Sequence, residues 1–139
     1  MKVLTVRQPW ASAIMAGQKD IENRPWVPGR RLEWGERIAI HAAVAADLNA
    51  PAHLLDGDHL RDRGVVLGTV QFMSAHPIHS DECRWRDCYS NPWAMWSDGL
   101  YHWKLRNPQL LVTPIPARGQ LGLWSSPSVD DLLQSQPYQ

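Results

Sequence analysis

The stretch KVLTVRQPWASAIMAGQKDIENR, residues 2–24, predicts how the chain begins to fold. Its opening residues KVLTV form a short run rich in β-branched side chains, which is typical of a strand. Pro9 stands where a helix can begin, and apolar residues then recur at helical spacing up to Gly17, a residue type that commonly ends helices. Residues 20–26 fit an extended segment, in which Pro25 excludes a long central strand because it cannot donate to a ladder.

Further strands are predicted along the rest of the chain. Residues 107–124 are strand-like pieces broken by Pro and Gly, and residues 43–63 fit one or two short helices. The clearest strands are Arg37–Ala42, Gly64–Phe72 and Leu100–Leu105. In the second of these, we expect a bulge or a close backbone approach at Gly68. We therefore predict a mainly β protein of the α+β class, a small and partly open β-barrel with one early helix, peripheral helices and a functional cleft at its rim.

The composition excludes several classes of protein. The 139 residues carry 14 basic and 14 acidic side chains, so a bulk basic nucleic-acid binder of the histone kind is excluded. No apolar run approaches the length that spans a bilayer, the N-terminus lacks the pattern of a signal peptide, and two cysteines do not make a disulfide scaffold. We expect a cytoplasmic protein with no membrane partner and no cofactor.

Two features of the composition favour contact with bases and phosphates. The chain has 8 Trp but only 1 Phe, and 11 Arg but only 3 Lys. Both Trp and Arg present flat faces that stack on bases, and Arg also holds phosphates with paired hydrogen bonds. Residues 1–41 carry a net charge of +3, which is offset by the later segments. A Trp-rich core and a GC-rich genome explain the same counts equally well.

Lys19, Glu22 and Arg24 are the first candidate site. Glu22 and Arg24 lie two apart on an extended segment and therefore share a face, and Lys19 comes from the turn before it. A carboxylate between two cations suits a phosphate or a polar base edge, and it would activate water if Lys19 lost its proton on burial. The alternative is a salt-bridge network that joins the helix to the barrel.

Other candidate ligand-binding residues lie near this motif. Helix N-termini bind anions through free N–H groups, and Trp rings beside a loop stack on bases or simply cap the core. A single His such as His41 could act as an acid or base at the cleft. The alternative is a polar residue at the edge of the barrel whose hydrogen bonds are all made within the protein. Trp10 is expected in the core. The candidates are Arg7, Gln8 and Ser12 at the start of the helix, Trp26 and Trp34 in the loop, and His41.

A metal site is the third kind of candidate. His76, His79, Cys83 and Cys88 are four residues of the types that bind zinc, within thirteen positions. Their spacing departs from the usual paired short Cys loops, and a reduced surface loop explains them as well. We therefore predict no metal, with these four residues as the zinc candidate.

Four blocks of the sequence, taken together, resemble the ASCH domain of the PUA-like superfamily. The signature G-x-K-x-x-E-x-R is present at Gly17, Lys19, Glu22 and Arg24. The other blocks follow the family order: VRQPWASAI before the signature, ENRPW and RIAIHAA after it, and then WKL, NP and PIPARG. The resemblance covers about residues 1–124, which we take as the domain, with residues 125–139 as a tail that holds a short helix over Val129–Ser135.

The resemblance implies a five- to six-stranded barrel that binds RNA or nucleotides in a cleft beside the signature. Some small members hydrolyse N4-acetylcytidine with a Lys, a Thr and a Glu, and others are ribonucleases. Lys19 matches that Lys, Glu22 stands where the Thr stands, and no residue here matches the later Glu. Three hypotheses follow: a module that binds RNA, a nucleotide or a modified nucleoside; a hydrolase using Lys19 and Glu22; or an interaction domain without a ligand.

Overall fold

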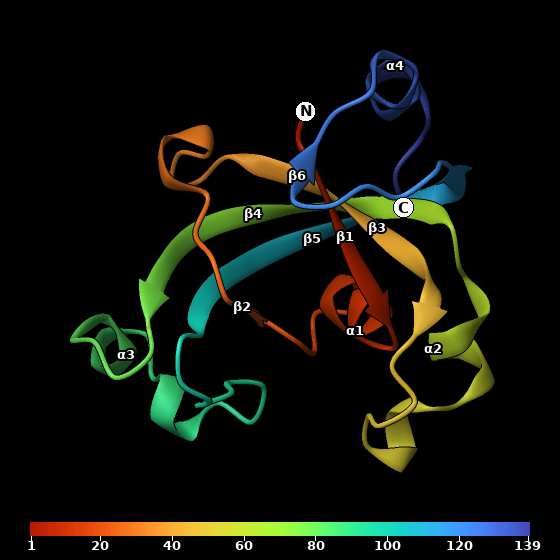
Figure 1. Ribbon diagram of the computed structural model, residues 1–139. Helices are drawn as coiled ribbons and strands as arrows, with labels where there is room; N and C mark the ends of the chain where they lie inside the picture. The colour runs from red at the N-terminus through yellow and green to blue at the C-terminus, as the bar shows by residue number, and fades with distance from the viewer.

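Two long antiparallel strands, β4 (Val65–Pro77) and β5 (Tyr101–Pro116), form the middle of the fold and curve together through the molecule (Figure 1). They belong to a six-stranded sheet with the strand order β2-β5-β4-β3-β1-β6, in a computed structural model that describes residues 1–139. β1 (Val3–Gln8) and β3 (Arg37–Ala46) are parallel, and every other neighbouring pair is antiparallel.

The two edge strands are short. β2 (Ile21–Arg24) pairs with β5 alone and ends just before Pro25, while β6 (Leu123–Trp124) pairs with β1 alone. The predicted mainly β class with peripheral helices is confirmed. The sheet is curved but not closed, because no ladder joins β2 to β6.

The first core lies between the sheet and the early helix α1 (Trp10–Met15), which packs on β1, β3, β4 and β5. Its buried side chains include Ile14, Phe72 and Trp103. The close approach expected at Gly68 is confirmed: the β4–β5 register shifts beside it, and a methyl group there would lie 2.2 Å from the carbonyl oxygen of Gln109. The sheet therefore bends around α1 at a position where only glycine fits.

The second core lies on the opposite face of the sheet, because side chains alternate along each strand. Leu4 faces the α1 core, whereas its neighbour Val3 faces the second core under α4 (Pro127–Ser135). Val129 and Leu133 of α4 are buried there, and the N-terminal amino group is 2.7 Å from Asp130. The N-terminus and α4 lie at the same end of the molecule (Figure 1). The short helix expected in the tail is confirmed, and the domain boundary at residue 124 remains a prediction.

Two segments differ from their predictions. Residues 43–46, which the sequence predicts to be helical, continue strand β3. Residues 107–116 are not separate strand pieces, because β5 continues through Asn107, which takes a left-handed φ of 53°. Asn tolerates that conformation, so the strand bends without ending. The short helices occupy the connections: η1 (Gly29–Arg31), η2 (Ala52–Leu54), α2 (Gly57–Arg61), α3 (Glu82–Trp85) and η3 (Cys88–Ser90).

The helices give no membrane span, since none is both long and apolar enough to cross a bilayer.

Candidate functional site

The three signature side chains come together because the chain turns sharply between α1 and β2. Gly17 takes a φ of +81° just after α1, and the backbone N–H of Lys19 donates to the carbonyl of Ala13. Lys19 therefore lies in the turn, and Glu22 and Arg24 lie on one face of β2. This is the arrangement that the sequence predicts.

Glu22 is held between two cations. Its Oε1 is 3.4 Å from the Nζ of Lys19. Its Oε2 accepts a hydrogen bond from Nε of Arg24 at 2.9 Å and forms an ion pair with Nη2 of the same side chain at 2.8 Å. Arg24 also donates to the carbonyl of Thr5 on β1, and Lys19 donates to the carbonyl of Ile21. Lys19 and Glu22 are only 4% and 7% exposed, so the ion pairs lie at the boundary of the core.

Burial lowers the pKa of Lys19 from its ordinary value. The neighbouring Glu22 opposes this shift by favouring the ammonium form, and the positive charge of Arg24 adds to it. Desolvation outweighs the ion pair, so Lys19 gives up its proton more readily than a surface lysine does.

A cleft opens over these residues. One hollow of about 480 Å³ is lined by Lys19, Glu22 and Trp10, and a second of about 430 Å³ is lined by Arg7 and Arg24. The two share Trp10, Glu22 and Asn23, so Glu22 lies where they meet. Their size is that of pockets that hold nucleoside-sized ligands.

Two tryptophans form the wall beside Lys19. Its Nζ is 5.5 Å from the ring centroid of Trp10 and 5.9 Å from that of Trp93, and the two rings meet edge to face. Trp10 is half-buried rather than fully in the core, and its Nε1 donates to Asp47 at 3.0 Å. Sequence reasoning missed Trp93 and Asp47, because neither is near the signature in the chain.

Of the three candidates at the start of the helix, the structure brings only Arg7 to the cleft, where it is exposed. Gln8 is fully buried: its Oε1 accepts from the backbone N–H of Ser12 at 2.9 Å, and its Nε2 donates to the Ser12 hydroxyl at 2.7 Å and to the carbonyl of Asp62 at 2.9 Å. Ser12 borders a different hollow, near α2. These two side chains satisfy each other and join β1 to α1.

The two loop tryptophans lie outside the cleft. Trp26 packs edge to face on Trp103, with the guanidinium of Arg31 5.3 Å from the centre of its ring. Trp34 is 65% exposed, with Arg86 5.7 Å from the centre of its ring. Neither borders the hollows that contain Glu22.

His41 lies in a third hollow of about 440 Å³, which shares Thr5, Ala43, Gln120 and Leu121 with the second. Its Nε2 is 2.7 Å from the carbonyl of Ala117, and its buried Nδ1 has no hydrogen-bond partner. Burial lowers the pKa of His41, so the ring is neutral at physiological pH. The three hollows together extend the cleft across the molecule.

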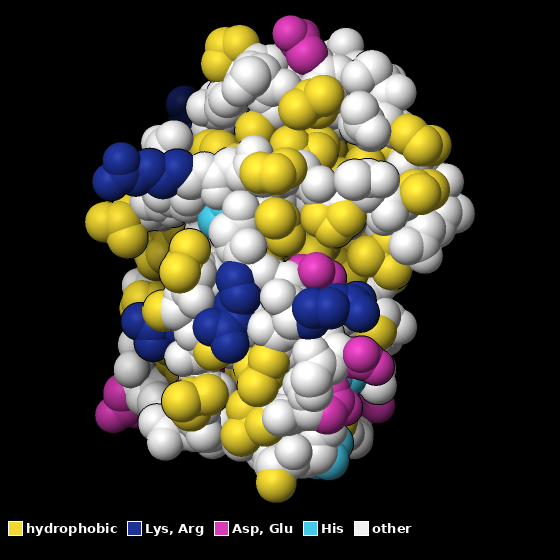
Figure 2. Space-filling view, turned by 90° about the vertical axis from the view of Figure 1, so that its right-hand side faces the viewer, with side chains coloured by type: hydrophobic (Ala, Val, Ile, Leu, Met, Phe, Trp, Pro, Cys, Tyr) yellow, Lys and Arg dark blue, Asp and Glu magenta, His cyan; other side chains and the backbone are white.

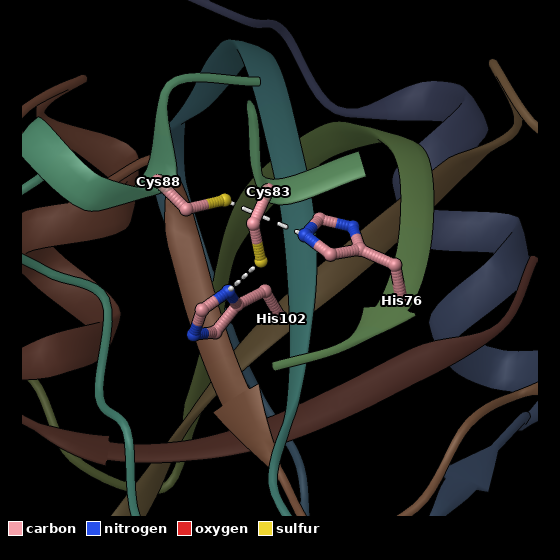
Figure 3. A group of neighbouring side chains, drawn as sticks. All are labelled: His76, Cys83, Cys88 and His102. Atoms are coloured by element: carbon pink, nitrogen blue, oxygen red, sulfur yellow. Dashed lines mark hydrogen bonds between the residues drawn. The ribbon is translucent and has the colours of Figure 1, made fainter. Parts of the chain in front are cut away.

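The zinc candidates are only partly brought together. His76, Cys83 and Cys88 meet in the interior, whereas His79 is exposed and lies against Trp96 at 4.9 Å between ring centroids. His102 takes the fourth place (Figure 3). Both cysteines are fully buried, so the alternative of a reduced surface loop is wrong for these two residues.

Comparison with known proteins identifies the family. A family model described as "ASCH domain" matches residues 4–104. Activating signal cointegrator 1 of Homo sapiens is 27% identical over 129 residues, and that of Mus musculus is 27% identical over 131; each match covers 87% of this chain and 21% of the relative. This chain therefore spans about a fifth of the length of those relatives.

A solved structure agrees with the fold. The crystal structure of ASCH from Zymomonas mobilis matches with a TM-score of 0.62 at 18% sequence identity, and the match covers 98% of this chain and 95% of that one. The family model spans most of the chain and includes the signature that holds Lys19, Glu22 and Arg24. This chain belongs to the ASCH domain family.

Proposed function

We propose that this protein binds single-stranded RNA or a nucleotide, with one base held in the cleft above Lys19, Glu22 and Arg24. One observation carries the proposal: a nucleoside-sized hollow combines two tryptophan rings with a buried carboxylate and a buried ammonium group. Unstacked bases are recognised by such a combination of aromatic faces and polar groups.

Each group at the cleft suits a different part of a base. A tryptophan face stacks on the ring of any base, while an oxygen of Glu22 accepts from an amino or imino group at the base edge. Lys19 donates to a base carbonyl. The ion pairs hold these groups in place before the ligand arrives, which lowers the entropic cost of binding.

The surface charge supports a modest contribution from phosphate contacts. Lys and Arg side chains on the face in Figure 2 are interspersed with acidic and hydrophobic ones, and the whole chain is neutral. Arg7 and Arg118 are exposed cations at the cleft. We expect a shallow log–log salt slope, about −2 to −4 for a single strand.

Trp93→Ala should weaken binding of a short single-stranded RNA by roughly 5- to 150-fold, because one stacked base contributes about 1–3 kcal/mol. Fluorescence anisotropy with a labelled RNA measures this change. The matched control is Trp85→Ala, which removes a tryptophan that is 79% exposed and outside the cleft. Equal affinity of the two variants would contradict a base in this cleft.

A second candidate function is hydrolysis of an acylated nucleoside such as N4-acetylcytidine. The observation that favours it is the buried Lys19 at the cleft, whose lowered pKa leaves more of it in the neutral form that can accept a proton. Neutral Lys19 would take a proton from water while the water oxygen bonds to the acetyl carbon. The bond from that carbon to N4 then breaks, and the proton passes from Lys19 to N4, which releases cytidine and acetic acid.

Lys19→Met should abolish this turnover, because methionine keeps the shape of the side chain but cannot accept a proton. Chromatography of N4-acetylcytidine reactions measures the cytidine released, and the same samples run against RNA on a gel test the ribonuclease alternative. Lys2→Met, which removes an exterior lysine paired with Glu36, is the matched control. Turnover that survives in Lys19→Met would contradict this mechanism. A parent protein that neither binds nor cleaves any of these ligands would favour the interaction-domain hypothesis.

A further inference from the structure

Four metal-ligating side chains meet inside the protein, away from the signature. His76 is the penultimate residue of β4 and His102 is the second residue of β5, and the two are directly opposite in the strand pairing. Cys83 lies on α3 and Cys88 begins η3. All four are buried, and one ligand atom from each lies within 4.8 Å of every other, with the side chains pointing toward one another (Figure 3).

Hydrogen bonds to the outer nitrogens orient both histidine rings. Nδ1 of His76 is 3.2 Å from Glu82 and 3.3 Å from the Ser74 hydroxyl, which leaves Nε2 facing Cys88. Nε2 of His102 donates to the carbonyl of Met95 at 2.8 Å, which leaves Nδ1 facing Cys83. Metal-binding histidines characteristically use their second nitrogen in this way, with a carboxylate or a backbone carbonyl.

We propose that His76 Nε2, Cys83 Sγ, Cys88 Sγ and His102 Nδ1 bind one zinc ion in a tetrahedral site. Two sulfur and two nitrogen ligands are the donor set of structural zinc, and four protein ligands leave no open position for chemistry. Zinc bond lengths place neighbouring sulfur and nitrogen ligands about 3.6 Å apart. The Cys83–His102 and Cys88–His76 pairs are already 3.6 and 3.4 Å apart.

The charge of the site balances on binding. Each thiol releases one proton to solvent, and the two thiolates neutralise the charge of Zn²⁺. Because the four ligand atoms lie so close together, they enclose a single ion rather than a cluster.

The proposed zinc ion would stabilise the wall of the cleft that contains Trp93. The segment after Cys88 contains Trp93 and Met95, and the side chain of Asn23 forms hydrogen bonds with both. The Asn23 Nδ2 donates to the backbone carbonyl of Trp93, and the Asn23 Oδ1 accepts from the backbone N–H of Met95. Met95 is also the residue whose carbonyl accepts from His102. Zinc would therefore hold the segment that places Trp93 beside Lys19.

Metal content of the full chain, expressed with zinc in the medium, tests the proposal. Elemental mass spectrometry should find close to one zinc ion per chain in the parent, and His102→Gln and Cys88→Ser should lose it. His79→Gln is the matched control, since it removes an exposed histidine that is near in sequence but outside the group, and it should keep the zinc. Cobalt substituted into the parent should give the absorption of a tetrahedral thiolate complex.

If a variant fails to fold, measurements on the unsubstituted parent protein still test the proposal. Zinc should protect both thiols from alkylation, and a strong chelator should remove that protection. A parent without metal, a Cys83–Cys88 disulfide in the mass spectrum, or loss of zinc in His79→Gln but not in His102→Gln would each overturn the proposal. Weaker RNA binding after chelation is also expected; only this consequence rests on the proposed function, whereas the metal content does not.

Discussion

Replacing Glu22 with glutamine should lower the free energy of unfolding by about 3–5 kcal/mol, the cost of removing one partner from a buried ion pair. Glu22 is the carboxylate shared by Lys19 and Arg24, and Lys19 is only 4% exposed. In the variant, the nearly buried ammonium group of Lys19 would keep the positive charge of Arg24 nearby but would lose its carboxylate partner. Urea unfolding measures the loss.

The loss should become smaller as the pH rises. Without Glu22, burial and the charge of Arg24 both lower the pKa of Lys19. Of the groups that raise this pKa, only Asp20, with its smaller effect, remains. The unfolded chain then binds the lysine proton more tightly than the folded one does, so stability increases with pH up to the ordinary lysine pKa.

Two further variants separate charge from packing. Lys19→Met combined with Glu22→Gln should recover part of the stability, because it removes the unpaired ammonium group. Glu33→Gln is the matched control at an exposed carboxylate, and it should change stability by less than about 0.5 kcal/mol. Equal effects of Glu22→Gln and Glu33→Gln would show that the buried ion pairs do not contribute to stability.

Gly68→Ala should destabilise the fold by about 3 kcal/mol, the upper end of the cost of overpacking a core. The added methyl group would lie 2.2 Å from the carbonyl oxygen of Gln109 and 2.9 Å from the Cα of Leu110. Both are backbone atoms of β5, so the strand pair itself must separate. Urea unfolding again measures the effect.

Gly57→Ala is the matched control for this change. Its added methyl group would meet nothing within 4 Å, and the residue begins α2. We expect a change of less than about 0.5 kcal/mol, since alanine favours helix and fits the space. Similar stability of the Gly68 and Gly57 variants would contradict the close β4–β5 approach.

Much of the fold could be predicted from sequence because its elements have local signals. Alternating side chains mark β3, and β-branched runs mark β1 and β4. The prediction failed at Asn107, where an Asn–Pro pair looked like a break. There the β4 ladder carries β5 through a left-handed residue, which is a tertiary effect.

Part of the candidate site could also be predicted from the sequence, and part could not. Lys19, Glu22 and Arg24 lie within six positions, so a turn and one short strand suffice to bring them together. Trp93 reaches Lys19 from a segment more than seventy positions away, and no local pattern marks it as part of the same wall. The predicted loop tryptophans, Trp26 and Trp34, lie elsewhere for the same reason: nearness in the chain did not place them at the cleft.

The amino-acid sequence by itself determined the mainly β class, the family signature and three of the four residues of the proposed metal site. Local side-chain periodicity and short-range turns are sufficient for these features. Only the tertiary structure decided that Trp93 faces Lys19 and that His102 rather than His79 joins the two cysteines. The last choice depends on the pairing of β4 with β5, which places His76 opposite His102, and strand register is set by packing across the whole sheet.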